Sequence, residues 1–168
     1  MRAYIFTALL LSTSPSHAQV PGQKPKASNA PVAHPANDVT IRATIIAVRN
    51  VEATQFSAKQ DLSGKPADAL NALEALVAQR KATSVALPAV TAKSGQRAVS
   101  DSGKITLEVQ SVVSPDGTIA DINLAFDDNG HKIVTSFQAS NGGVKFLGSV
   151  QSPTDKAMTD YIFVRVSY

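Results

Sequence analysis

The stretch ITLEVQSVVSPDGTIADINLAF, residues 105–126, decides the fold of this chain. In its first half, residues 105–113, apolar and polar side chains alternate, which is the pattern of a strand buried on one face. The sequence SPDG at 114–117 predicts a tight turn, because proline fixes φ, aspartate bonds to the local backbone and glycine accepts a positive φ. Residues 118–126 alternate again, so the stretch predicts two antiparallel strands joined by this turn.

The same pattern continues towards the C-terminus. Asn129-Gly130 is the strongest short hairpin signal in the chain, and it leads into a strand over residues 132–139. The sequence NGG at 141–143 predicts another turn, which is followed by a strand over residues 144–150. The apolar run YIFVRV at 161–166 predicts the last strand, so this half of the chain is expected to contain strands and turns only.

Two further strands are predicted before residue 105. Residues 39–48 alternate at first and are apolar on both faces at the end, which predicts a strand buried first on one face and then on both. Residues 85–92 contain Pro88, which cannot donate to a strand ladder and therefore indicates an edge strand or a bulge. Ser94-Gly95 marks the turn after it.

One helix is predicted, over residues 66–81. Pro66 suits the first helical turn, where no backbone N–H is needed. Leu70, Leu73 and Val77 recur at helical spacing and form one apolar stripe, which predicts that the helix packs on a sheet. With about seven strands around this helix, residues 38–168 are predicted to form a single α+β domain on an antiparallel or mixed sheet.

The N-terminus has the order of a secretory signal peptide over residues 1–18. Met1-Arg2 supplies a positive charge, residues 3–11 are uncharged and apolar, and the small residues Ser16 and Ala18 flank position 17. The apolar run is about half of the roughly 20 residues that span a bilayer, so a permanent anchor is not expected. We therefore predict cleavage after Ala18 and a periplasmic location, with association with the outer membrane left open.

Residues 19–37 contain four prolines and no hydrophobic periodicity, which predicts an extended, disordered leader. Its Lys24 and Lys26 could make weak contacts with anionic envelope polymers. The net charge of the chain is only +3, the basic residues are scattered and Trp is absent, so nucleic-acid binding is not expected. No later segment is long and apolar enough to predict a transmembrane helix. Without cysteine, the chain has neither disulfides, a lipoprotein anchor nor thiolate chemistry.

No catalytic constellation is recognisable in the sequence. His34 lies in the leader and His131 follows a turn, and two isolated histidines do not make a zinc site. DDNG at 127–130 lacks the alternating ligands and the closing glutamate of a calcium loop; a charged hairpin tip explains it better, and weak calcium binding there is left open. No nucleophile motif, carboxylate dyad or phosphate loop is found. We therefore predict a non-enzyme, with no catalytic, cofactor-binding or metal-binding residues and no cofactor.

The sequence LPAVTAKSGQRA at 87–98 resembles the signature of the secretins, the outer-membrane channel proteins of type II and type III secretion and of type IV pili. In that signature a short strand begins near a proline and runs to a Gly-Gln and a nearby Ala. The sequences GKITLEV at 103–109 and VSPDGTI at 113–119 are similar to the strand and turn that follow in the family, and TSFQASNGGVKFLG at 135–148 to its later strand pair. The resemblance covers roughly residues 39–167. The motif residues that it implies, all with structural roles, are Pro88, Gly95, Gln96, Ala98, Gly103, Pro115, Asp116, Gly117 and Gly148.

The chain departs from the secretin pattern in one segment. Secretins have a long insertion after the Gly-Gln-x-Ala strand, which supplies gate and membrane-facing hairpins, whereas only residues 99–102 separate Ala98 from Gly103 here. A membrane-spanning strand needs about 9–11 residues, so four residues cannot supply a membrane hairpin. The ring-stacking N-terminal domains of secretins are missing as well, and the chain is not expected to form a channel by itself.

The resemblance implies an exported, non-catalytic module that binds protein partners or self-associates by strand pairing, in secretion or in pilus-type assembly. An exposed strand edge is a natural template for such addition, and residues 85–92 are one candidate edge. A periplasmic binding or inhibitor domain unrelated to secretion is the main alternative. An enzyme with an unrecognised site is a third.

Overall fold

Eight strands and two helices make up residues 38–168, which are the residues that this computed structural model describes, apart from the side chains of residues 86–88. The predicted signal peptide (1–18), the predicted leader (19–37) and His34 lie outside the described residues. In chain order the elements are β1 (Asp38–Arg49), α1 (Asn50–Lys59), α2 (Pro66–Ala78), β2 (Ala82–Lys93), β3 (Arg97–Asp101), β4 (Ile105–Val113), β5 (Ala120–Asp128), β6 (His131–Ala139), β7 (Val144–Gln151) and β8 (Met158–Ser167).

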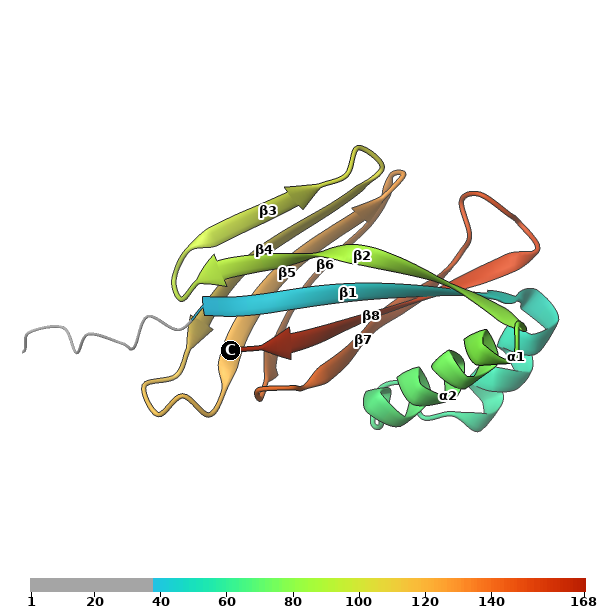
Figure 1. Cartoon of the computed structure of the whole chain (residues 1–168), viewed down its shortest axis with the longest axis horizontal. Helices are drawn as coiled ribbons and strands as arrows, with labels where there is room; N and C mark the ends of the chain where they lie inside the picture. Colours follow the sequence, from blue (N-terminus) through green and yellow to red (C-terminus); the bar gives the residue numbers. More distant parts are fainter. Residues whose placement is uncertain (1–37) are drawn as a thin grey trace, which may run out of the picture. The chain divides into compact units, whose positions relative to one another are not determined.

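The strands form two four-stranded antiparallel sheets (Figure 1). We call the sheet with strand order β2-β1-β8-β7 sheet A and the sheet with order β3-β4-β5-β6 sheet B. Sheet B is a meander in which each strand pairs with the next along the chain. Sheet A joins the two ends of the described chain, because β1 pairs with the C-terminal β8 over ten residue pairs.

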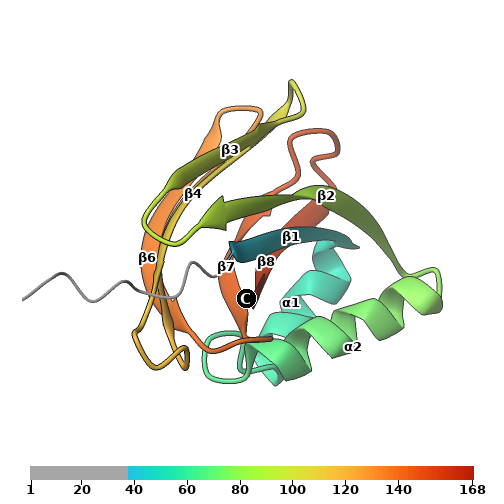
Figure 2. The ribbon, with the colours of Figure 1, turned by 60° about the vertical axis from the view of Figure 1, so that its left-hand side comes forward.

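Sheet A lies between sheet B and the two helices, which gives three layers (Figure 2). On β1, Ile41 and Ile45 face the core between the sheets, whereas Ile46 and Val48 face the core under the helices. β8 divides its side chains in the same way between the two cores. The predicted strand over 39–48, buried first on one face and then on both, is therefore confirmed.

The turns that join the strands have the backbone geometry that their sequences predict. Asn129 and Gly130 both have positive φ, 50° and 89°, which is a two-residue type I′ turn. In the predicted SPDG turn, the Gly117 N–H donates to the Ser114 carbonyl at 2.9 Å, and Gly117 has a φ of 71°. The alternating burial of β4 and β5 confirms the predicted hairpin over 105–126.

β2 is the edge strand that Pro88 predicts. It pairs with β1 alone in sheet A, and the pairing register shifts between Arg42 and Thr44. Arg42 lies opposite Ala89 and Thr44 opposite Ala86, so Pro88 falls in the bulge. Both readings of this proline, an edge strand and a bulge, are confirmed.

The α+β class and the antiparallel pairing are confirmed, and the prediction of about seven strands and one helix is roughly right, since the structure has eight strands and two helices in residues 38–168. The chain has a second helix, α1, which buries only Ala53 and Phe56 and therefore shows little hydrophobic periodicity. A short strand, β3, also precedes β4. The strands separate into two sheets, because sheet B turns its apolar face onto sheet A and leaves the other face exposed.

The predicted helix over 66–81 ends at Ala78, three residues earlier than expected. Arg80 has a φ of 60°, and its N–H donates to the Val77 carbonyl while the Lys81 N–H donates to the Leu76 carbonyl. This is a Schellman motif with arginine where glycine is usual. Without a glycine, the sequence carried no sign of the helix end.

Candidate functional site

Several of the secretin-like motif residues lie at one end of sheet B, in two neighbouring turns. The Gly95 N–H donates to the Ser111 carbonyl at 2.6 Å, and Gln96 closes the turn by donating to the Lys93 carbonyl. This places the turn against the end of β4, where the turn containing Pro115, Asp116 and Gly117 begins. Two neighbouring turns therefore contain five of the motif residues, namely Gly95, Gln96, Pro115, Asp116 and Gly117.

The other motif residues are dispersed. Gly103 lies in the β3–β4 turn at the opposite end of sheet B, with a φ of 82°. Ala98 is half-buried in β3 and packs on the core between the sheets, and Pro88 lies in the β2 bulge. Gly148 follows a register shift in β7, and a Cβ there would meet only Ile133 Cδ1 at an ordinary 3.7 Å. The nine residues do not converge on one pocket.

The four edge strands of the two sheets differ in how well they are protected against pairing with another chain. β2 and β7, the edges of sheet A, both contain register shifts, which disrupt a pairing edge. β3, one edge of sheet B, is only five residues long. β6, the other edge, is nine residues long and contains no proline, glycine or register shift.

The outer edge of β6 is not paired with another strand in residues 38–168, although β7 packs near it, with Lys145 Nζ 6.0 Å from the centre of the Phe137 ring. Within residues 38–168, β6 pairs with β5 alone, and Tyr168 Oη is the one side-chain group that donates to its backbone, at the Ala139 carbonyl. The type I′ turn makes Asp128 and His131 the hydrogen-bonded pair that closes the hairpin. Hydrogen-bonded and non-hydrogen-bonded pairs then alternate along the strands. The residues whose N–H and C=O groups point away from β5 are therefore Lys132, Val134, Ser136 and Gln138.

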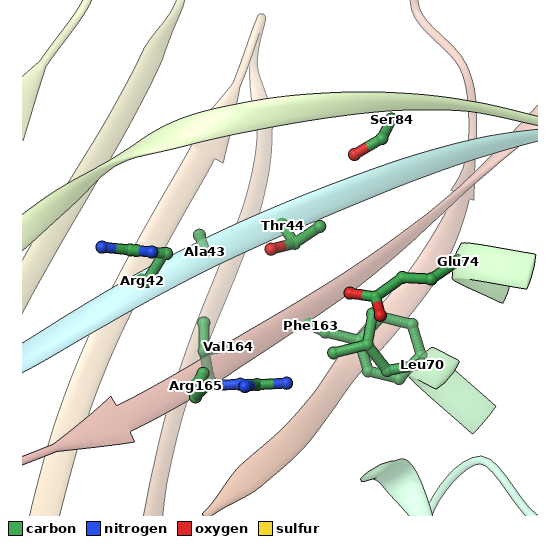
Figure 3. A pocket seen from close by; sticks show the side chains of 9 residues that line it. All are labelled: Arg42, Ala43, Thr44, Leu70, Glu74, Ser84, Phe163, Val164 and Arg165. Atoms are coloured by element: carbon green, nitrogen blue, oxygen red, sulfur yellow. The ribbon is translucent and has the colours of Figure 1, made fainter. Parts of the chain in front are cut away.

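A groove lies on the outer face of sheet A beside α2, with a volume of about 370 Å³ (Figure 3). Leu70 and Phe163 give it an apolar side, and Arg42, Arg165 and Glu74 bring charges. The two arginines are direct cross-strand neighbours on β1 and β8, yet their guanidinium groups point apart in Figure 3. They are therefore not arranged as a clamp for one anion.

A second cavity, of about 350 Å³, opens between the two sheets at the end where β5 meets the β5–β6 hairpin turn. Asp128 and Asp160 line it and are only 6% and 5% exposed, and the buried Ser152 lies beside them. Burial raises the pKa of Asp160 above its ordinary value, and the charge on Asp128 raises it further. A hydrogen bond from Ser152 and the charge of His131 act in the opposite direction on this pKa.

Asp160 and Ser152 are site residues that the sequence analysis missed. A signal for Asp160 was present, because Ile162, Val164 and Asp160 have the same parity along the strand and therefore face the same side of the sheet. An aspartate at an inward-facing position is unusual and marks a polar site. Ser152 lies outside any regular pattern and had no such signal.

The remaining candidate groups do not converge. The three glutamates, Glu52, Glu74 and Glu108, lie on α1, α2 and β4, and Glu108 forms an ion pair with Arg97 at 2.6 Å. Among residues 38–168, no three histidine, aspartate or glutamate side chains are close enough to form a metal site by themselves. Neither described helix is long and apolar enough to cross a membrane.

Comparison of the chain with protein-family models, with curated proteins and with solved structures finds no match.

Proposed function

We propose that this chain is an exported, periplasmic protein that acts without catalysis, as a secretin-like module that binds proteins in secretion or in pilus-type assembly. The observation that carries the proposal is the unprotected outer edge of β6. An exposed edge strand presents unpaired N–H and C=O groups, to which an extended segment of another chain can add as a further strand.

The side chains of β6 also favour an added strand. Val134 is 70% exposed on the outer face of sheet B, although valine is usually buried. Ser136 and Gln138 beside it are neutral, and the one charged side chain among the four residues whose backbone groups point outward is Lys132, at the start of the strand. Charges along an edge are a common protection against pairing, and the central part of β6 lacks them.

The order of the elements supports the secretin-like part of the proposal. The order that the resemblance implies is kept by β1, α2, β2 with its proline bulge, the turn at Gly95-Gln96 and the hairpin around Pro115. The helix α1, which lies between β1 and α2, is an addition to that order. Residues 99–102 lie in β3 and in the turn after it, so this segment makes no excursion from the sheet. Such a module would contribute to an assembly through its strands and not through a membrane hairpin of this segment.

Light scattering coupled to size-exclusion chromatography tests whether the protein associates with copies of itself through β6. The wild-type protein should have a mass above that of the monomer, and the mass should increase with concentration. Val134→Pro removes an outward N–H without breaking a bond to β5, and it should reduce the protein to a monomer.

Val99→Pro is the matched control. Val99 lies in the same row across sheet B, through Glu108 and Ala125 to Val134, but on the short edge strand β3. The β3–β4 turn has two residues, Gly103 and Lys104, and the Ser102 N–H closes it by donating to the Ile105 carbonyl. Because hydrogen-bonded and non-hydrogen-bonded pairs alternate from this closing pair, the Val99 N–H also points away from the neighbouring strand. This variant should keep the wild-type mass, and an equal loss in both variants would contradict a role specific to β6.

A different protein partner is tested by photo-crosslinking in the cell envelope. A crosslinking residue at Ser136 should give a discrete adduct, and the same residue at Val99 should not. A strict monomer without an adduct at Ser136 would overturn the proposal.

That outcome would favour the second candidate function, a periplasmic binding or inhibitor domain unrelated to secretion. The groove beside α2 supports this candidate, because it combines an apolar side with charged groups and has the volume of a small-molecule site.

A further inference from the structure

Asp128 and Asp160 bring two buried carboxylates from different sheets to one cavity. Asp128 ends β5 in sheet B, and Asp160 lies in β8 in sheet A. Both side chains line the cavity between the sheets, and both are more than nine-tenths buried. Two carboxylates placed in this way repel each other and are poorly solvated, so the arrangement costs stability unless a positive charge compensates it.

Asp160 is the more exceptional of the two. Its Oδ1 is fully buried and has no hydrogen-bond partner among the described residues. Buried polar atoms in proteins are almost always paired, and buried charges are paired or bind a metal ion. Lys104 also lines the cavity, but it forms no ion pair with either aspartate. The one ion pair within 4.0 Å in residues 38–168 joins Arg97 and Glu108. The charge of His131 lowers the pKa of Asp160, but no lysine, arginine or histidine of residues 38–168 lies within ion-pair distance of the Asp128 or Asp160 carboxylate.

Most of the other polar groups around the cavity carry oxygen atoms that can coordinate a metal ion. Ser152 and Thr154 contribute hydroxyl groups, and Asp155 adds a third carboxylate to the lining, whose Oδ1 accepts the Ala157 N–H. Calcium binds six to eight oxygen ligands in flexible geometry and accepts water among them, whereas magnesium requires a near-ideal octahedron. We propose that this cavity binds a calcium ion through the carboxylates of Asp128 and Asp160, with Ser152 and water completing the coordination.

This site differs from the hairpin-tip loop at 127–130, the segment that the sequence analysis compared with a calcium loop. Asp127 and Asp128 are consecutive residues of a strand, so their side chains lie on opposite faces of sheet B. Asp127 Oδ1 accepts the Gly130 N–H on the outer side, whereas Asp128 faces the cavity. The second carboxylate of the site comes from Asp160 and not from the loop.

Calcium at this position would connect the two sheets where the cavity separates them. With two carboxylates as the main ligands, the dissociation constant should be about 10⁻⁴–10⁻³ M, as in extracellular calcium modules. The bound ion should therefore raise the melting temperature at millimolar calcium by mass action.

Thermal unfolding of the purified protein, treated with a chelator and dialysed, tests the proposal. Calcium chloride should raise the melting temperature, and magnesium chloride at equal ionic strength should raise it much less. Asp128→Asn and Asp160→Asn should each lose the calcium-dependent increase. Asp160→Asn should in addition melt above the wild type in the absence of calcium, because it removes a buried charge without changing the size of the side chain.

Asp127→Asn is the matched control, since it changes the neighbouring residue on the opposite face and keeps the oxygen that accepts the Gly130 N–H. It should respond to calcium like the wild type. Loss of the response in Asp127→Asn would place the site at the hairpin tip, and absence of any calcium-specific increase in the wild type would also overturn the proposal. If Lys104→Met and Asp160→Asn both lower the melting temperature without calcium, Lys104 is the counterion and the proposal is wrong.

Discussion

Sheet A and sheet B have the same number of strands but differ in what covers them. Sheet A buries one face against sheet B and much of the other against the two helices, whereas sheet B has one face open and one unprotected edge, β6. Burial is the dominant source of stability, so sheet A should carry more of it. Sheet A should therefore supply most of the stability, whereas the proposed interaction edge belongs to sheet B, and the predictions that follow test this division.

The largest effect is expected for Phe163→Ala in β8. Phe163 is fully buried between sheet A and the helices, and its ring centroid lies 5.1 Å from that of Phe146. Truncation of a buried Phe leaves a cavity and should lower the free energy of unfolding by about 3–5 kcal/mol. Denaturant unfolding measures this change, and a loss below about 1 kcal/mol would contradict the central role of sheet A.

A smaller effect is expected for Tyr161→Phe, which leaves the ring in place and removes a hydroxyl group. The Tyr161 hydroxyl donates to the Ala53 carbonyl at 2.9 Å and shares a hydrogen bond with Ser57, so it ties α1 to sheet A. Its loss should lower the free energy of unfolding by about 1–2 kcal/mol. Amide hydrogen exchange should accelerate in α1 more than in sheet B, and uniform acceleration would show that the hydroxyl does not act on α1.

Val134→Thr on the open face of sheet B should hardly change stability. Val134 is 70% exposed, and threonine keeps the β-branched shape, so the free energy of unfolding should stay within about 0.5 kcal/mol of the wild type. Denaturant unfolding of a dilute sample measures it. A loss as large as that of Phe163→Ala would mean that this face is not a free surface.

The smallest effect is expected for Asp116→Asn in the β4–β5 turn, and this effect should depend on pH. Hydrogen bonds from the Ser114 hydroxyl first, and then from the backbone and hydroxyl of Thr118, lower the pKa of Asp116 below its ordinary 3.8. A lowered pKa in the folded state stabilises the protein above pH 3.8, and this contribution is lost as the pH falls through the lower, folded-state value. Asp116→Asn should therefore be less stable than the wild type at pH 7, and the difference should shrink below pH 3.8. A difference that grows on acidification would contradict this sign.

Much of sheet B could be predicted from the sequence, because its strands alternate regularly and are joined by turns with strong local signals. Ile105 to Val113 was predicted with the bounds that the structure has, and the turns at 114–117 and 129–130 adopt the expected conformations. Sheet A was harder to predict, since strands that are buried on both faces do not alternate. The division into two sheets depends on the pairing of β1 with β8, residues far apart in the sequence, for which no local pattern exists.

The candidate sites were predicted less well than the fold. The motif residues mark turns and bulges and do not converge, and Asp160 became apparent as a site residue only when the structure placed it beside Asp128. α1 was missed because two buried residues are too few to produce a periodic signal. The edge of β6 could not be predicted either, since the position of a strand within its sheet is a property of the whole chain.

The most direct test of the account is the hydrogen exchange of the β6 amides as a function of protein concentration. The Val134 and Ser136 N–H groups point away from β5, so they should exchange rapidly in dilute protein and slowly in concentrated protein, as a second chain pairs with the edge. The Val99 N–H, on the opposite edge, should exchange at the same rate at every concentration. Equal and concentration-independent exchange at Val134 and Val99 would contradict the assignment of β6 as the interaction edge.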